Sequence, residues 1–166
     1  LGLCYEYGKG VDQDLKEAVR WYKLAAVKGH ARAQNNLGVL HRLGRGVPQS
    51  ETTALEWFRK SAAQGLAHAQ FSLGTSFLDG VEVPQNVAEA ARYFLQAAEQ
   101  GHVGSMNNIG VLYKKGGHGV TKNEATAASW YRKAAEAGCA GGQCNLAECY
   151  YHGKGVTTVS YTHLRA

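Results

Sequence analysis

The chain has 166 residues, of which 45% are hydrophobic, and its net charge is +5. The hydrophobic fraction excludes wholesale disorder, and no apolar run approaches the roughly 18 residues that a membrane-spanning helix requires. The 18 Lys and Arg residues are scattered along the chain without a recognisable nucleic-acid-binding module. We therefore expect a solvated basic surface and no nucleic-acid partner.

A short glycine loop recurs along the chain. "GKGV" at residues 8–11 returns as "GRGV" at 44–47 and as "GKGV" at 153–156, and related loops occupy residues 80–83 and 116–120. The steps between the first glycines are 36, 36, 36 and 37 residues. A phosphate loop needs GxxxxGK followed by Ser or Thr, whereas Lys9 and Lys154 are followed by Gly. A dinucleotide loop needs a preceding strand, and the sequence predicts none. We interpret the loop as a turn that every unit shares.

Two helices are predicted for each unit. The first ends at the loop glycine, as in "AQNNLGVLHRLG" at residues 33–44, and the second follows, as in "ALEWFRKSAAQG" at residues 54–65. In the second helix, apolar residues at i, i+3, i+4, i+7 and i+8 form one stripe. In chain order, the first helices end at Gly8, Gly44, Gly80, Gly116 and Gly153, and the second helices end at Gly29, Gly65, Gly101 and Gly138.

Each second helix is preceded by a good N-cap residue, three positions after the loop valine. Two of these caps, with Glu17 and Glu89 three residues later, have the spacing of a capping box. The four predicted caps are Asp14, Ser50, Asn86 and Asn123.

Small residues in the first helix predict close helix packing. Gly38 directly follows the core residue Leu37, and a glycine there lets the neighbouring helix approach. We expect the aromatic pair Trp57 and Phe58 to fill the wedge between units, because one unit alone buries too little apolar surface to fold. Ala147 replaces this glycine in the last unit and predicts looser packing there.

The combined pattern "AxAQxxLGxxYxxGxGV", a cap residue and "AxxWYxKAAxxGH" resembles Sel1-like repeats, relatives of the tetratricopeptide repeat. The resemblance implies an all-α fold, an α-solenoid in which antiparallel helix pairs stack into a right-handed superhelix. It also implies an adaptor or scaffold that binds other proteins through a concave face lined by the first helices, and no enzyme. The expected array covers residues 1–158, with units at 1–30, 31–66, 67–102, 103–139 and 140–157, of which the first and last are partial.

The pattern breaks after Val156. Val159 stands where a cap is expected, and residues 159–166 resemble the translation of a transposon-type sequencing adapter. We treat this tail as non-native. The chain begins at the seventh position of a unit and closes with a lone first helix, so we expect it to be part of a longer array.

Four cysteines, Cys4, Cys139, Cys144 and Cys149, fit neither a CxxC redox pair nor a zinc site. We expect these cysteines to act as small buried hydrophobic residues, which slightly favours the reducing cytoplasm as the compartment of the protein. The resemblance also allows an endoplasmic-reticulum membrane complex, so the compartment stays open, as does a Cys139–Cys144 disulfide. A cysteine-rich subgroup with paired cysteines in every unit has been linked to β-lactam binding. This chain lacks that pairing, so a β-lactam-binding enzyme is kept only as an alternative, beside a basic nucleic-acid-binding repeat.

The histidines do not predict a metal site. His30 and His102 occupy the same turn position as Leu66 and Cys139, which indicates turn packing. His41 stands at an aromatic core position, where we expect a core histidine with hydrogen-bond partners. No catalytic constellation, metal or cofactor is predicted.

The partner is predicted to be a protein or peptide. By analogy with tetratricopeptide grooves, the Asn, Arg and Lys residues among the variable positions would hold an acidic or C-terminal peptide, with Phe71 or Tyr151 as its anchor. Alternatively, the asparagines bond backbone within the stack. The variable first-helix positions are Arg32, Asn35, Val39, Arg42, His68, Phe71, Thr75, Leu78, Asn107, Val111, Lys114, Cys144, Glu148 and Tyr151.

Overall fold

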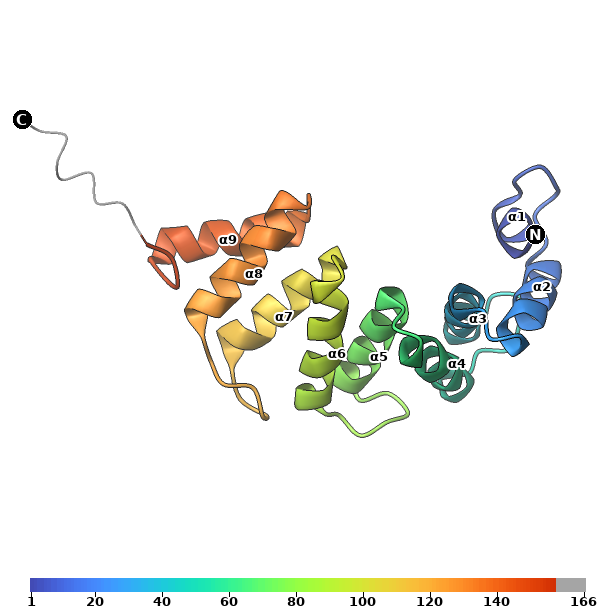
Figure 1. The fold of residues 1–166 in the computed structure, drawn as a ribbon, viewed down its shortest axis with the longest axis horizontal. Helices are drawn as coiled ribbons and strands as arrows, with labels where there is room; N and C mark the ends of the chain where they lie inside the picture. The colour runs from blue at the N-terminus through green and yellow to red at the C-terminus, as the bar shows by residue number, and fades with distance from the viewer. Residues whose placement is uncertain (158–166) are drawn as a thin grey trace, which may run out of the picture. The chain divides into compact units, whose positions relative to one another are not determined.

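A computed structural model describes residues 1–157 of the chain, and these residues form helices with no regular strand (Figure 1). The all-α prediction is confirmed. The tail at 159–166, which we treat as non-native, lies outside the described residues. In chain order the helices are α1 (Gly2–Tyr7), α2 (Leu15–Val27), α3 (Ala31–Leu43), α4 (Glu51–Ala63), α5 (Ala67–Asp79), α6 (Val87–Glu99), α7 (Val103–Lys115), α8 (Glu124–Glu136) and α9 (Ala140–His152).

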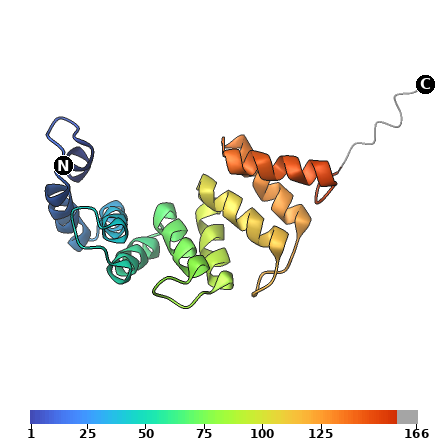
Figure 2. The same ribbon diagram turned by 180° about the vertical axis from the view of Figure 1, so that it is seen from behind.

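The helices pack in successive pairs, and the chain divides into two compact units. The N-terminal unit covers Leu1–Ala97 and the C-terminal unit begins at Ala98. Within each unit, helices that follow one another in sequence lie side by side, as both ribbon views show (Figures 1 and 2). Each unit is therefore a stack of antiparallel helix pairs, the arrangement of an α-solenoid.

The predicted N-caps of the second helices are confirmed. In each case the side-chain oxygen accepts a backbone N–H from the first turn of its helix, which satisfies one of the amides that a helix start leaves unpaired. The acceptors and their donors are Asp14 with Lys16 and Glu17, Ser50 with Thr53, Asn86 with Glu89, and Asn123 with Thr126.

The two capping boxes are not formed. Glu17 pairs with Arg20 at 3.3 Å instead of reaching back to Asp14. The backbone N–H of Asp14 donates to the carbonyl of Tyr5, at the end of the preceding first helix, at 3.0 Å. The same bond recurs in the next three repeats, where the backbone N–H groups of Ser50, Asn86 and Asn123 donate to the carbonyls of His41, Phe77 and Tyr113, respectively. A carbonyl of the first helix thus accepts the N-cap N–H in place of the glutamate side chain. This bond connects the two helices of a repeat.

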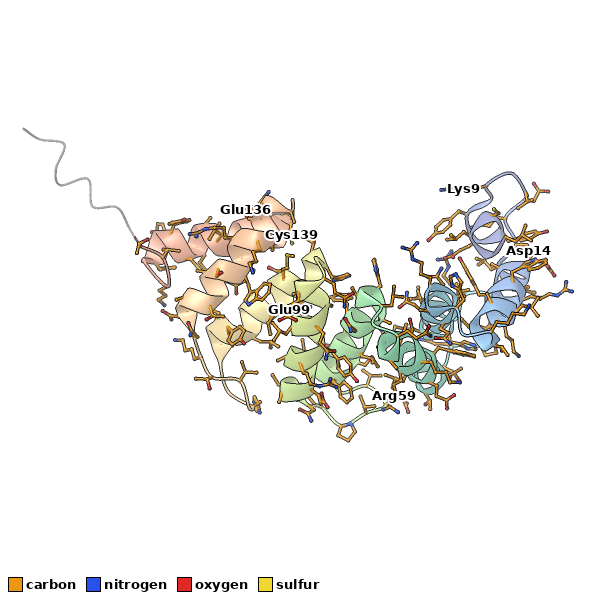
Figure 3. The ribbon with its side chains drawn as sticks, in the orientation of Figure 1. Lys9, Asp14, Arg59, Glu99, Glu136 and Cys139 are labelled. Carbon is orange, nitrogen blue, oxygen red and sulfur yellow. The ribbon has the colours of Figure 1, made fainter. Side chains whose placement is uncertain are left out.

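The starts of the first helices also have side-chain caps, which the sequence analysis missed. Nδ1 of His30 accepts the N–H of Ala33 at 3.3 Å, and His102 does the same for Ser105 at 3.2 Å. Cys139, at the same position and labelled in Figure 3, accepts through its Sγ. Leu66 has no acceptor, so α5 has no side-chain cap. The turn histidines therefore serve as helix caps.

Glycine and an aromatic ring meet at the centre of each helix pair. A Cβ on Gly38 would lie 2.7 Å from Cε1 of Phe58, closer than packed atoms approach, and the Phe58 ring is fully buried. This confirms the predicted close approach. The equivalent contacts are Gly2 with Tyr22, Gly74 with Phe94, and Gly110 with Tyr131.

The two aromatic residues of each pair have different neighbours. Trp57 packs on the apolar cluster that α2 and α3 share, which contains Ala18 and Leu37. Phe58 packs against Gly38 of its own pair and shares a cluster with Leu73 of α5, so this ring lies between two repeats as predicted. Ala147 is exposed, and looser packing at this site stays a prediction.

The repeated loop is a geometric element. Gly44 and Gly46 have φ angles of 65° and 73°, a region that side chains rarely adopt. A Cβ on Gly46 would lie 2.5 Å from the carbonyl oxygen of Leu15, at the start of α2. Val47 packs on the apolar cluster of that earlier helix pair. The loop thus joins consecutive helix pairs, which explains its recurrence without a phosphate.

Candidate protein-binding surface

A largely apolar groove of about 640 Å³ lies in the N-terminal unit. It is lined by the first helices α1, α3 and α5, with side chains of α2. Three of the predicted binding residues, Arg32, Asn35 and His68, line it. Among the apolar lining residues are Leu1, Leu3, Trp21 and Leu66.

Two residues that line this groove each have a buried polar atom without a hydrogen-bond partner. Asn35 is 8% exposed, and its Oδ1 accepts no bond. Nε1 of Trp21 is likewise buried and donates to nothing. A buried polar group left unpaired costs about 1–3 kcal/mol. The alternative that the asparagines bond backbone within the stack is therefore wrong for Asn35 Oδ1.

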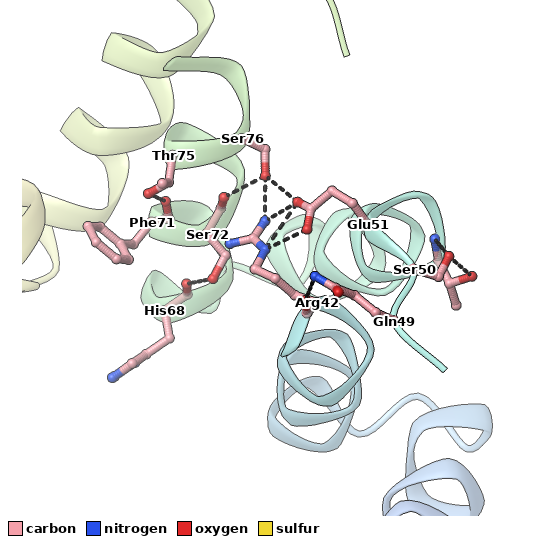
Figure 4. A network of polar contacts seen from close by, with 10 residues as sticks. Arg42, Gln49, Ser50, Glu51, His68, Phe71, Ser72, Thr75 and Ser76 are labelled. Carbon is pink, nitrogen blue, oxygen red and sulfur yellow. Dashed lines mark hydrogen bonds and ion pairs between the residues drawn. The ribbon is translucent and has the colours of Figure 1, made fainter. Parts of the chain in front are cut away.

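Arg42 belongs to a network inside the unit (Figure 4). Its Nε and Nη2 donate to Glu51 at 2.9 and 2.6 Å, and Nη2 also donates to Oγ of Ser76 at 2.5 Å. The guanidinium lies 4.6 Å from the centre of the Phe58 ring. The side chains of Arg42 and Glu51 are 25% and 15% exposed. Arg42 thus links α3, α4 and α5, and Glu51 already supplies the carboxylate that we expected from a peptide.

Two predicted residues of the C-terminal unit pair with each other. Nζ of Lys114 donates to Glu148 at 2.8 Å, and this bond holds the pKa of the Glu148 carboxyl below its usual range. Both side chains are partly exposed, at 36% and 49%. Oδ1 of Asn107 accepts a bond from Asn145 at 2.9 Å, so its partner is a side chain and not backbone.

Other predicted residues contribute to packing. Val39 and Val111 lie against the apolar clusters of their units. Phe71 lies 5.8 Å from the ring of Phe94, and the hydroxyl of Thr75 donates to the Phe71 carbonyl. Leu78 is half-buried.

Tyr151 and Cys144, the two predicted residues that remain, are exposed on α9. Tyr151 is 86% exposed and its ring lies edge-on to His152, at 4.9 Å between ring centres. Cys144 is exposed and free. Either side chain is therefore accessible to a partner.

The cysteine and histidine predictions need correction in part. All four cysteines are free. Cys149 is buried as expected, and burial raises the pKa of its thiol, whereas the exposed Cys144 is no buried hydrophobic residue. Nδ1 of His41 is buried without a partner, so the expectation of a fully bonded core histidine is wrong for that atom. Within residues 1–157, no cluster of three or more His, Cys, Asp or Glu side chains is placed to hold a metal ion.

The repeat pattern matches a known family over almost the whole chain. A sequence model of the Sel1 repeat matches residues 1–30, 31–66, 67–102, 103–139 and 140–162. The chain belongs to the Sel1 repeat family. The Sel1 repeat scaffold fits a protein-interaction module in general, and proteins of this family are generally non-enzymatic scaffolds. No curated protein matches the chain significantly.

Solved structures of Sel1 repeat proteins are similar to this chain. A protective antigen of uropathogenic Escherichia coli with an SLR fold is 45% identical, with a TM-score of 0.88 over 94% of this chain. A Sel1 repeat protein from Oxalobacter formigenes is 34% identical, with a TM-score of 0.88 over 95% of this chain. This chain spans 33% and 62% of the lengths of those two proteins.

A more distant structure shares the fold. Helicobacter pylori cysteine rich protein B is 21% identical, with a TM-score of 0.63 over 81% of this chain and 96% of its own. Among the residues described for this Sel1 repeat chain, no helix has the length and apolar character to cross a bilayer.

Proposed function

We propose that this Sel1 repeat chain is a protein-interaction module, and that its N-terminal unit binds a partner peptide in the groove lined by Arg32, Asn35 and His68. One observation carries the proposal. A largely apolar groove of about 640 Å³ is lined by Asn35 and Trp21, whose Oδ1 and Nε1 are buried without hydrogen-bond partners.

A peptide main chain matches these two atoms. It offers an N–H that can donate to Oδ1 of Asn35 and a C=O that can accept from Nε1 of Trp21. Each bond removes the desolvation cost of a buried unpaired group. Apolar side chains of the peptide would enter between Leu3 and Leu66, which line the same groove.

Charge favours an acidic peptide or a free C-terminus. Arg32 is exposed and forms no ion pair with any other described residue. The lining of the groove contains no Asp or Glu. A carboxylate beside Arg32 would gain a charge-assisted hydrogen bond. Arg42 has no part in this proposal, because it is paired with Glu51.

Peptide selection tests the proposal. Peptides selected from a random display library against the purified chain should be enriched in Asp, Glu or a free C-terminus. Their affinity should fall about tenfold in Arg32→Glu and in Asn35→Leu, since each loses about one charge-assisted or buried hydrogen bond. Arg132→Glu, on α8 of the C-terminal unit, is the matched charge control. If the control weakens binding as much as Arg32→Glu, the groove is not the binding site.

A further inference from the structure

A second, polar groove of about 370 Å³ lies in the N-terminal unit, where α4, α5 and α6 meet. It shares no lining residue with the apolar groove. Its lining includes two arginines and no carboxylate, whereas the smaller cleft beside Arg42 contains Glu51 and Asp79. The lining residues are Arg59, Ala62, Ala63, Gly65, Gln70, Arg92, Tyr93 and Gln96.

Arg92 is held in place by its own helix. Its Nε donates to Glu89 at 2.5 Å, and its guanidinium lies 4.2 Å from the centre of the Tyr93 ring. The bond to Glu89 uses Nε and does not involve the two Nη groups. A guanidinium that is already positioned loses less conformational entropy when it binds an anion.

Arg59 supplies a second positive charge to the same groove. It is exposed on α4 (Figure 3) and forms no ion pair with another described residue. In the preceding pair of second helices, the equivalent positions are Lys23 and Glu56, which have opposite charges. The groove between α4 and α6 is thus lined by two arginines, of which Arg92 is paired with Glu89, where the preceding pair of second helices carries opposite charges.

We propose that this groove binds an oxyanion, held between the guanidinium groups of Arg59 and Arg92. Both arginines line the same groove, and an oxyanion bound there would form charge-assisted hydrogen bonds with each of them. The amides of Gln70 and Gln96 and the phenol of Tyr93 line the rest of the space. The oxyanion is either a carboxylate of an acidic protein segment or phosphate.

Titration by NMR tests this site and separates the two sources. The purified chain is titrated with inorganic phosphate and, separately, with a short polyglutamate peptide, while the Nε–Hε signals of the arginines are followed. Signals of Arg59 and Arg92 should shift with at least one probe, and the probe that binds identifies the source. Arg59→Gln should weaken that binding about tenfold, the value of one charge-assisted hydrogen bond.

Lys23→Gln is the matched control, since it removes the charge at the equivalent position one repeat earlier. We expect it to change the affinity by less than about twofold, because an exposed charge outside the groove contributes little. The proposal is wrong if neither probe shifts the two arginine signals, or if Lys23→Gln weakens binding as much as Arg59→Gln. Neither variant touches the apolar groove, so this outcome is independent of the peptide-binding proposal.

Discussion

Tyr22 in the N-terminal unit and Tyr131 in the C-terminal unit occupy the same repeat position with different polar surroundings. Each ring packs against a glycine, Gly2 or Gly110. The hydroxyl of Tyr22 donates to Glu6 at 2.6 Å, whereas the hydroxyl of Tyr131 is buried with no partner. The repeat thus specifies the apolar contact and leaves the hydrogen bond to residues that differ between units.

The same contrast holds where consecutive helix pairs meet. In the N-terminal unit, Arg42 is largely buried and bonds both Glu51 and Ser76. At the equivalent position of the C-terminal unit, Lys114 reaches Glu148 near the surface. Equivalent positions therefore contribute differently to stability, although the backbone repeats.

The largest effect should come from the contact that both units share. Gly38→Val and Gly110→Val each place a branched side chain where even a Cβ would lie 2.7 or 2.6 Å from the facing ring. Both should lower the free energy of unfolding by about 3 kcal/mol, the upper range for overpacking. Urea unfolding followed by circular dichroism measures this loss.

Gly141→Ala is the control for these two variants. Its Cβ would meet Asn107 at an ordinary 3.6 Å. It should change stability by no more than about 0.5 kcal/mol, because residue 141 is exposed in the first turn of α9 and the new contact is an ordinary one. If only one of the two variants, Gly38→Val or Gly110→Val, lowers the free energy of unfolding, the glycine–ring contact is not equivalent in the two units.

A smaller effect should separate the two ion pairs. Arg42→Met leaves the largely buried Glu51 without its partner and should cost about 2–3 kcal/mol. Lys114→Met breaks a half-exposed pair and should cost less than about 1 kcal/mol. The same unfolding measurement in 0.5 M salt provides a check, since screening should reduce only the Lys114 effect. Equal losses from the two substitutions would contradict the difference in burial.

The effects of removing the two tyrosine hydroxyls should have opposite signs. Tyr22→Phe removes the donor to the buried Glu6 and should cost about 1.5–2 kcal/mol. Tyr131→Phe removes a buried hydroxyl that has no partner and should raise stability by about 1 kcal/mol. Thermal unfolding of the two variants measures the difference. Destabilisation by Tyr131→Phe would mean that its hydroxyl has a partner in solution.

Alkaline titration gives an independent reading of the same pair. Burial raises the pKa of Tyr131 to about 12 and also raises that of Tyr22, where the nearby Glu6 adds to the effect. An unfolded tyrosine loses its proton near pH ~10, so above that pH the unfolded state is deprotonated first and is favoured. Stability should be unaffected below pH ~10 and fall above it. The fall should be smaller in Tyr131→Phe.

Much of the candidate site was not predictable from the repeat pattern. Arg42 and Lys114 had the same expected role because they share a repeat position. Arg42, however, forms an ion pair with Glu51 of the neighbouring helix. Arg59 and Arg92 lie 33 residues apart in the sequence and line one groove only because α4 and α6 both border it. Contacts between helices depend on side-chain reach across the stack, which spacing along one helix does not encode.

The sequence by itself determined the all-α fold, the ends of the helices and the positions that need glycine. These features are local, because N-caps such as Asn123, helix-ending glycines and apolar stripes act within a few residues of one another. Only the tertiary structure decided which polar atoms find partners, as at Asn35 and Asn107. A buried hydrogen bond depends on atoms from separate helices meeting within about 3 Å, and that distance is set by packing.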